Sequence, residues 1–322
     1  MDLKKIAQEI RSYPGVTRKR IIPDVLKYFS IPKEGNIIAA FGEDAAVIDF
    51  GEEALLLAAD GIMEDLMMKN AFWAGYCSVL VNVNDIAAMG GIPLGMVSVI
   101  SMKKGEVLDE VLKGIQEGIR KFGVPMVGGH THPDCNYNAV DVAILGHVKK
   151  DEVILSSTAE VGDDIIFTMD IQGVFTPKIP YSWDSTRTKE PEVIQKQIGI
   201  MNHIAGKKLL SAGKDISNPG SLGTLAMLLE TSGKGGEIDL RSIPAPDNVD
   251  FTQWLKAYQG YGFVVTCKPE NSEEALKQFN SVGGSSAVVG RITDDRKLKI
   301  GDGKDTLVLF DFKKDVITGC RK

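Results

Sequence analysis

The chain has 322 residues and a mass of 34.9 kDa, which is more than one hydrophobic core usually organises, so two domains are expected. Its composition, 43% hydrophobic and 25% charged, is that of an ordinary globular protein. The net charge of −6 and the pI near 5.4 argue against nonspecific nucleic-acid binding and suit a protein that recruits cations. The most apolar segment, 78–100, is broken by polar residues and is not a membrane span. The N-terminal residues lack a secretory h-region, so we expect a cytoplasmic protein.

In the first half of the chain, the apolar spacing predicts alternating helices and strands. Two short helices come first, and two short apolar runs then meet across Gly51 as a hairpin or adjacent strands. A longer helical pattern follows and stops at Gly90-Gly91-Ile92-Pro93. The predicted helices are 3–12, 21–29, 71–89 and 107–122, and the predicted strands are 45–49, 54–59, 95–101, 124–127 and 139–147.

The second half repeats this pattern. Because many strands are short and joined by turns, it favours an α+β fold over a doubly wound sheet. We assign 1–152 to an N-terminal domain, 153–312 to a C-terminal domain, and 313–322, which contains Cys320, to a mobile tail. The predicted helices of this half are 192–211 and 221–232, and the predicted strands are 165–169, 236–240, 262–267 and 286–291.

Four aspartates, each in a short motif of its own, carry most of the functional information. Asp44 lies in Gly-Glu-Asp-Ala-Ala, Asp60 follows the apolar run 55–59, Asp85 lies in Asn-Val-Asn-Asp-Ile-Ala-Ala-Met-Gly-Gly, and Asp215 begins Asp-Ile-Ser-Asn-Pro-Gly. Carboxylates gathered beside apolar residues repel one another unless a cation neutralises them. Hard oxygen ligands are typical of Mg²⁺, which commonly also binds phosphate groups. Each aspartate taken alone is equally well explained as a helix cap or a turn residue.

Other segments are candidate anion or metal sites. Gly128-Gly129-His130 follows a predicted buried strand and would bring backbone N–H groups to an anion, although a plain tight turn is the alternative. Ser217 and Gly220 precede a helix whose N-terminus favours anions. The basic cluster 18–20 is either a phosphate clamp or a solvated helix face. The four potential zinc ligands within 130–135 are too crowded to surround one tetrahedral ion. The sequence contains neither a P-loop nor a G-x-S-x-G elbow.

In this order, the motifs resemble those of the AIR synthase-related superfamily, which includes AIR synthase, thiamine-monophosphate kinase, selenophosphate synthetase and the hydrogenase maturation dehydratase. The resemblance spans about 41–292. The segment 81–91 closely resembles the kinase, whereas Gly128-Gly129-His130 and the segments 201–206 and 215–223 are more similar to the synthetase. The whole chain is similar to archaeal AIR-synthase-related proteins that are grouped as methanogenesis markers.

Several positions depart from these relatives. Selenophosphate synthetase carries a reactive cysteine or selenocysteine near its N-terminus, but no cysteine precedes Cys77 here, which argues against selenide chemistry. The kinase has aspartates at the positions of His130 and Asn218 and an arginine near that of Ser156, which argues against phosphorylation of thiamine monophosphate. The maturation factor ends in a cysteine, whereas Cys320 is not the last residue of this chain.

The resemblance implies an α+β fold of two domains, in which N-terminal strands of two chains form a dimeric β-barrel and the C-terminal α+β domain closes over the site. It implies a homodimeric, ATP- and Mg²⁺-dependent phosphoryl-transfer enzyme that activates a small-molecule acceptor. The alternatives are a thiamine-monophosphate kinase, a selenophosphate-synthetase-like protein without the reactive cysteine, or a non-catalytic nucleotide-binding regulator. By the same resemblance, Mg²⁺ would be held by Asp44, Asp60, Asp85 and Asp215, and the nucleotide by Asn82, Gly128, Gly129, His130, Ser217 and Gly220.

Overall fold

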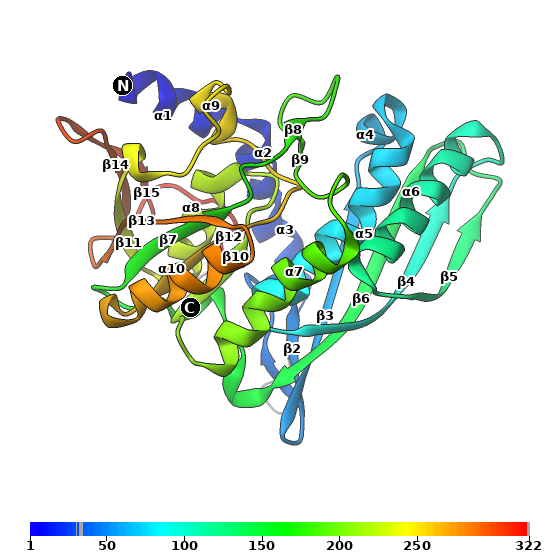
Figure 1. Ribbon diagram of the computed structural model, residues 1–322, viewed down its shortest axis with the longest axis horizontal. Coiled ribbons are helices and arrows are strands. Elements are labelled where there is room, and N and C mark those ends of the chain that lie inside the picture. Colours follow the sequence, from blue (N-terminus) through cyan, green and yellow to red (C-terminus); the bar gives the residue numbers. More distant parts are fainter. Residues whose placement is uncertain (30, 32–34, 321–322) are drawn as a thin grey trace.

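The computed structural model describes residues 1–29, 31 and 35–320, which form two large sheets packed against helices, and one small two-stranded sheet (Figure 1). This arrangement confirms the predicted α+β class. The α-helices are α1 (Leu3–Ser12), α2 (Pro14–Thr17), α3 (Ile22–Leu26), α4 (Glu64–Lys69), α5 (Ala71–Ala88), α6 (Glu106–Phe122), α7 (Pro191–Gly206), α8 (Gly220–Ser232), α9 (Phe251–Trp254) and α10 (Ser272–Ser281).

The first sheet has six strands in the order β1-β2-β3-β6-β4-β5. β2 and β3 form the hairpin expected across Gly51, whose φ of +75° favours glycine. β2 also pairs with β1, and β3 with β6, so neither of the strands predicted at 45–49 and 54–59 lies at an edge of the sheet; the edges are β1 and β5. The strands are β1 (Ile37–Ala39), β2 (Ala46–Phe50), β3 (Glu53–Ile62), β4 (Ile92–Ser101), β5 (Met126–His132) and β6 (Ala139–Lys149).

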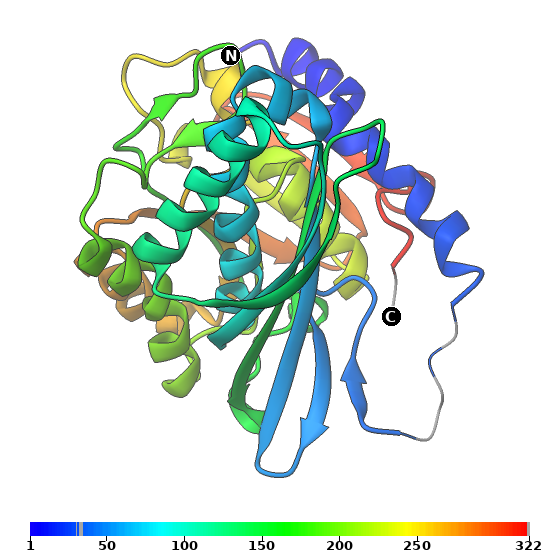
Figure 2. The same cartoon turned by 90° about the vertical axis from the view of Figure 1, so that its right-hand side faces the viewer.

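Helices α5 and α6 lie on one side of the long strands of this sheet (Figures 1 and 2). α5 begins after Asn70, whose side chain accepts a hydrogen bond from the Trp73 N–H at 3.0 Å. Most residues of α5 are buried. The two helices approach closely because Gly114 has no side chain: a Cβ atom there would lie 1.9 Å from the Phe72 carbonyl oxygen. None of the helices in the described residues is long and apolar enough to span a membrane.

The opposite face of the sheet is apolar and exposed. Leu57 is 46% exposed and Leu145 is 37% exposed, and these two residues are paired across β3 and β6. Val97 and Val99 on β4 and Val127 on β5 are also exposed. The six strands form an open sheet within the described part of this chain, so one chain does not close a barrel.

The second sheet has seven strands in the order β10-β12-β7-β13-β11-β14-β15, and β8 and β9 form a separate pair. The interior strand β7, between β12 and β13, is buried along its whole length. The strands are β7 (Asp164–Met169), β8 (Val174–Phe175), β9 (Trp183–Asp184), β10 (Ala212–Asp215), β11 (Gly235–Asp239), β12 (Gly262–Cys267), β13 (Ser285–Thr293), β14 (Lys297–Gly301) and β15 (Thr306–Asp311).

Both ends of the chain pack against this second sheet and its helices. α1 shares a hydrophobic core with them, and its Arg11 guanidinium donates to the Leu309 carbonyl at 2.6 Å and pairs with Asp315 at 2.7 Å. The N-terminal helix therefore contacts the part of the chain that we assigned to the C-terminal domain. The mobile tail predicted for 313–322 is wrong for the residues described up to Cys320, because Cys320 is 7% exposed and packs in the interior.

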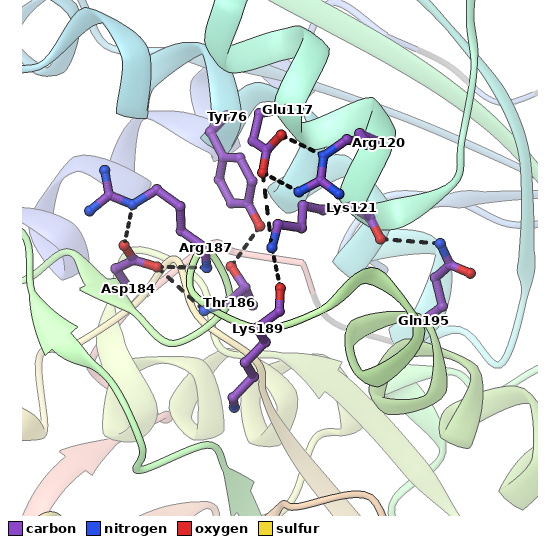
Figure 3. A network of polar contacts seen from close by, with 9 residues as sticks. All are labelled: Tyr76, Glu117, Arg120, Lys121, Asp184, Thr186, Arg187, Lys189 and Gln195. Atoms are coloured by element: carbon purple, nitrogen blue, oxygen red, sulfur yellow. Dashed lines mark hydrogen bonds and ion pairs between the residues drawn. The ribbon is translucent and has the colours of Figure 1, made fainter.

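A set of polar contacts joins the helices of the first sheet to α7 and to the segment before it (Figure 3). The Tyr76 hydroxyl of α5 donates to the Thr186 hydroxyl at 2.9 Å. The ammonium of Lys121 on α6 is buried and donates to the Lys189 carbonyl, while Gln195 of α7 donates to the Lys121 carbonyl at 3.2 Å. These contacts fix the position of α5 relative to the second half of the chain.

Candidate functional site

The structure brings the four predicted aspartates together from four different elements. Asp44 lies between β1 and β2, Asp60 in β3, Asp85 in the last turn of α5 and Asp215 at the end of β10. Asp44, Asp85 and Asp215 each offer a carboxylate oxygen, and these three oxygens lie within 4.8 Å of one another. Asp60 lines the same cavity as these three residues. The proximity is a structural finding, and the role of the four aspartates as metal ligands stays a prediction.

A first cavity of about 530 Å³ lies beside these carboxylates. This volume falls in the range of roughly 300–1,000 Å³ that is usual for small-molecule sites. One part of its lining is charged and another is apolar, which suits a ligand with an anionic and an apolar portion. The polar residues of the lining include Lys19, Asp44, Asp60, Asp85, Lys214, Asp215 and Ser217, and the apolar ones include Ile22, Leu26, Phe41, Leu57 and Met227.

A second cavity, of about 210 Å³, adjoins the first. The two cavities share Lys19, Asp60, Asp215 and Ser217, so some of the carboxylates face both spaces. The second cavity is lined mainly by polar groups that can donate or accept hydrogen bonds. Its other polar residues are Arg18, Asn84, Asn218, Tyr258 and Gln259.

A lysine that the sequence reasoning missed lies inside the aspartate cluster. The Lys214 ammonium pairs with the Asp44 carboxylate and donates to the Gly42 carbonyl at 3.3 Å. The second oxygen of Asp44 accepts a hydrogen bond from the Asp215 N–H at 3.2 Å. A signal was present in the sequence, because Lys214 directly precedes Asp215 after two small residues, and a lysine in a buried strand requires an anionic partner.

The electrostatics of the cluster favour a bound cation. Burial raises the pKa of Asp85 well above its usual range, and the charges of Asp60, Asp215 and Asp44 raise it further. Burial likewise raises the pKa of Asp215, with Asp44 adding to the effect and Lys214 opposing it. The carboxylates are therefore hard to ionise together without more positive charge nearby. A divalent cation would supply that charge.

The donor atoms at the site fit Mg²⁺. Three carboxylates supply hard oxygen ligands of the kind that Mg²⁺ prefers. Asn82 and Asn84 are buried, and among the described residues their side-chain carbonyl oxygens have no hydrogen-bond partner. Asn84 lines the second cavity, whereas Asn82 lines neither cavity and lies one helical turn before Asp85. Asn84 is therefore the one of these two residues that a ligand in the second cavity could contact.

Several other predicted site residues lie outside both cavities. The plain tight turn that was the alternative reading of Gly128-Gly129-His130 is not formed, because β5 continues through these residues as an exposed edge strand paired with β4. The His130 ring instead contacts the His132 ring, with centroids 4.6 Å apart.

Gly220 has a φ of +74°, and a Cβ atom there would lie 2.3 Å from the Leu255 carbonyl oxygen, so close packing explains this glycine. Ser217 does line both cavities. Nucleotide binding by Gly128, Gly129, His130 and Gly220 stays a prediction.

Two of the three departures from the kinase pattern, Asn218 and Ser156, hold the walls of the site. With its amide oriented by the surrounding hydrogen bonds, Asn218 donates to the Gly15 carbonyl at 3.2 Å and accepts from Arg18 at 3.1 Å. This arrangement fixes Arg18 at the second cavity. Ser156 is buried, its N–H donates to the Glu43 carboxylate, and its hydroxyl donates to the Gly42 carbonyl at 3.0 Å. Both residues therefore have structural roles in this chain.

Comparison with known proteins gives the family. The model for "AIR synthase related protein, N-terminal domain" matches residues 42–148, and the model for "AIR synthase related protein, C-terminal domain" matches residues 151–303. The chain belongs to the AIR synthase-related superfamily. It is 48% identical to an uncharacterized protein of Methanocaldococcus jannaschii, over 99% of this chain and 100% of that protein.

More distant superfamily members carry functional names. The chain is 28% identical to a selenide, water dikinase of Carboxydothermus hydrogenoformans, over 85% of this chain and 91% of that protein. Its fold is similar to that of Thermotoga maritima PurL in complex with ADP, with a TM-score of 0.75 and 17% identity. That match covers 95% of this chain but 49% of the PurL chain, so the chain spans about half the length of this structural neighbour.

Proposed function

We propose that this chain is an ATP- and Mg²⁺-dependent phosphoryl-transfer enzyme, a kinase or synthetase that activates a small-molecule acceptor. The observation that carries the proposal is the convergence of Asp44, Asp85 and Asp215, with oxygens within 4.8 Å of one another, beside a cavity of about 530 Å³. Two relatives support the choice of nucleotide chemistry, because one is named a dikinase and another is described in complex with ADP.

The residues of the first cavity would have distinct roles. The aspartates would hold Mg²⁺, and the bound Mg²⁺ would neutralise the negative charge of the phosphates. Lys19 is half-buried, lines both cavities and is placed to contact a phosphate oxygen. Ile22, Leu26 and Phe41 form an apolar wall suited to a nucleobase. In this arrangement, the protein contributes mainly positioning and electrostatic stabilisation.

We place the acceptor in the second cavity. It shares Asp60 and Asp215 with the nucleotide cavity, so an acceptor there would face the phosphate end of the nucleotide. The unpartnered Asn84 oxygen and the Arg18 guanidinium, held by Asn218, would recognise a small polar molecule that carries an anionic group. Its volume of about 210 Å³ suits a molecule much smaller than a nucleotide.

We also propose that two chains pair through the exposed face of the first sheet. Leu57, Leu145, Val97 and Val99 lie on neighbouring strands and are each more than a third exposed. Burying this apolar face against a second copy is favourable. Leu57 also lines the first cavity, so pairing would bring a second chain close to the nucleotide site.

The proposal is tested by ATP binding and ATP consumption. Calorimetric titration with ATP should show binding in Mg²⁺ that is lost in a chelator, and equal affinity in both buffers would contradict the metal role. Asp85→Asn should lose the Mg²⁺-dependent binding. Asp151→Asn is the matched control, because Asp151 is exposed and pairs with Lys208 away from both cavities.

A screen for acceptors separates the remaining alternatives. ATP consumption is followed with candidate small anionic acceptors, including thiamine monophosphate. Consumption that requires thiamine monophosphate would identify the kinase alternative. Tight Mg²⁺-dependent ATP binding without consumption in the presence of any acceptor would instead favour a non-catalytic regulator.

A further inference from the structure

Lys214 brings a positive charge into the aspartate cluster. Its side chain is 6% exposed, and that of its partner Asp44 is 5% exposed, so the pair is largely shielded from water. Among the described residues, no basic residue other than Lys214 forms an ion pair with any of the four aspartates. Lys19 lines the same cavity, but no described contact joins it to a carboxylate at ion-pair distance.

The Lys214 ammonium pairs with a carboxylate that also belongs to the candidate metal site. Asp44 gives one carboxylate oxygen to Lys214 and the other to the Asp215 N–H. Asp44 is also one of the three residues whose oxygens gather within 4.8 Å. The ammonium and a divalent cation would therefore compete for the same carboxylate.

We propose that Lys214 is a resident cation of this cluster. Its ammonium takes one of the positions at Asp44 that a divalent ion would otherwise fill, so the site holds fewer divalent ions than its four carboxylates could accept. Through Asp44 and the Gly42 carbonyl, it also keeps this part of the cavity wall in place before any metal arrives. The inference rests on the proposed cation site but not on ATP turnover.

The number of Mn²⁺ ions bound per chain, without nucleotide, tests this role. Electron paramagnetic resonance measures the free Mn²⁺, and the number of bound ions is the total minus the free Mn²⁺. The wild type, Lys214→Met and Lys214→Arg are compared, all purified in Mn²⁺. Methionine removes the charge and keeps much of the aliphatic length, so Lys214→Met should bind one more ion than the wild type. Lys214→Arg keeps the charge and should bind the wild-type number. A purely structural lysine would leave all three numbers equal.

Two further variants serve as controls. Lys256 is also buried and pairs with a carboxylate, Glu9, at 2.8 Å, but it lines neither cavity, so Lys256→Met should bind the wild-type number of ions. Asp44→Asn combined with Lys214→Met removes both charges of the pair. This double variant should bind no more ions than the wild type, because the additional position depends on Asp44.

The outcomes separate this inference from the proposed function. An unchanged Mn²⁺ number in folded Lys214→Met overturns the inference. A second result would also overturn the inference: Lys214→Met stays unfolded in Mn²⁺, while the Asp44→Asn, Lys214→Met double variant folds. In that case Mn²⁺ does not replace the missing ammonium beside Asp44. One additional ion in Lys214→Met supports the inference even if the wild type binds no ATP, a result that would contradict the proposed function alone.

Discussion

The buried carboxylate of Glu230 holds Thr318 through two hydrogen bonds, from its N–H at 2.7 Å and from its hydroxyl at 2.9 Å. The N–H groups of Ile317 and Gly319 also donate to Glu230. Thr318 and Cys320 line the first cavity, so this carboxylate fixes the last described residues as part of the cavity wall. Helix α8 is thereby connected to the C-terminal segment.

Replacing Glu230 with Ala should release this segment. The substitution leaves buried N–H groups without an acceptor, which costs about 1–3 kcal/mol for each group that stays unsatisfied. Burial raises the pKa of the Cys320 thiol and slows its reaction in the wild type. In a Cys135→Ser background, which removes the more accessible thiol, Glu230→Ala should therefore react faster with a thiol reagent. Glu274→Ala, at a half-buried position outside the first cavity, should not. An unchanged rate in Glu230→Ala would show that other contacts hold the segment.

Replacing Asp85 with Asn should stabilise the metal-free protein and abolish Mg²⁺-dependent ATP consumption. Burial raises the pKa of Asp85 well above 3.8 in the folded chain, so between the unfolded and folded pKa values the folded chain binds more protons. The contribution of Asp85 to stability is therefore greatest below the unfolded pKa and is lost as pH rises through the folded pKa.

The measurement is the melting temperature in a chelator. The advantage of Asp85→Asn over the wild type should grow as pH rises above the unfolded pKa of Asp85 and level off above the raised folded pKa. Added Mg²⁺ should stabilise the wild type more than the variant, because the variant lacks an anionic ligand. A variant that melts several degrees below the wild type and still consumes ATP normally would show that Asp85 is structural.

Some of this architecture could be predicted because local patterns determine it. α5 was predicted within a residue because its apolar run is long and ends at Gly90-Gly91, and Asp85 was singled out because it interrupts that run. β10 was missed because four residues that include Gly213 and Lys214 show no strand periodicity. A tight turn was the alternative reading of Gly128-Gly129, but pairing with β4 extends these residues as a strand. Such pairing depends on residues far away in the sequence.

The positions of both chain ends were also beyond local patterns. α1 was predicted with its observed bounds, but its packing depends on Leu309 and Asp315 near the other end of the chain. The order of the C-terminal segment depends on Glu230, whose four described donors could not be inferred from its place within a helix. The ion pair of Lys214 and Asp44 likewise joins residues that tertiary folding alone brings together.

Replacing Tyr76 with Phe should weaken the contact between α5 and the segment before α7. The ring keeps its stacking on Trp73, with centroids 5.2 Å apart, and loses only its hydrogen bond to Thr186. We expect a loss of about 1 kcal/mol in the free energy of unfolding, measured by urea denaturation. The double variant with Thr186→Val should lose less than the sum of the two single variants. Strict additivity would mean that the hydrogen bond does not couple the two segments.

Replacing Val97 with Lys should separate the proposed dimer while preserving the fold of each chain. Val97 is 46% exposed on the open face of the first sheet, where a charge would have to be desolvated if a second chain covered it. Light scattering at micromolar concentration should show a dimer for the wild type and a monomer for Val97→Lys, with matching circular dichroism spectra. Leu112→Lys is the control, since Leu112 is similarly exposed but lies on α6, on the opposite side of the sheet. A wild type that is monomeric at these concentrations, or a Val97→Lys variant that stays dimeric, would contradict pairing through this face.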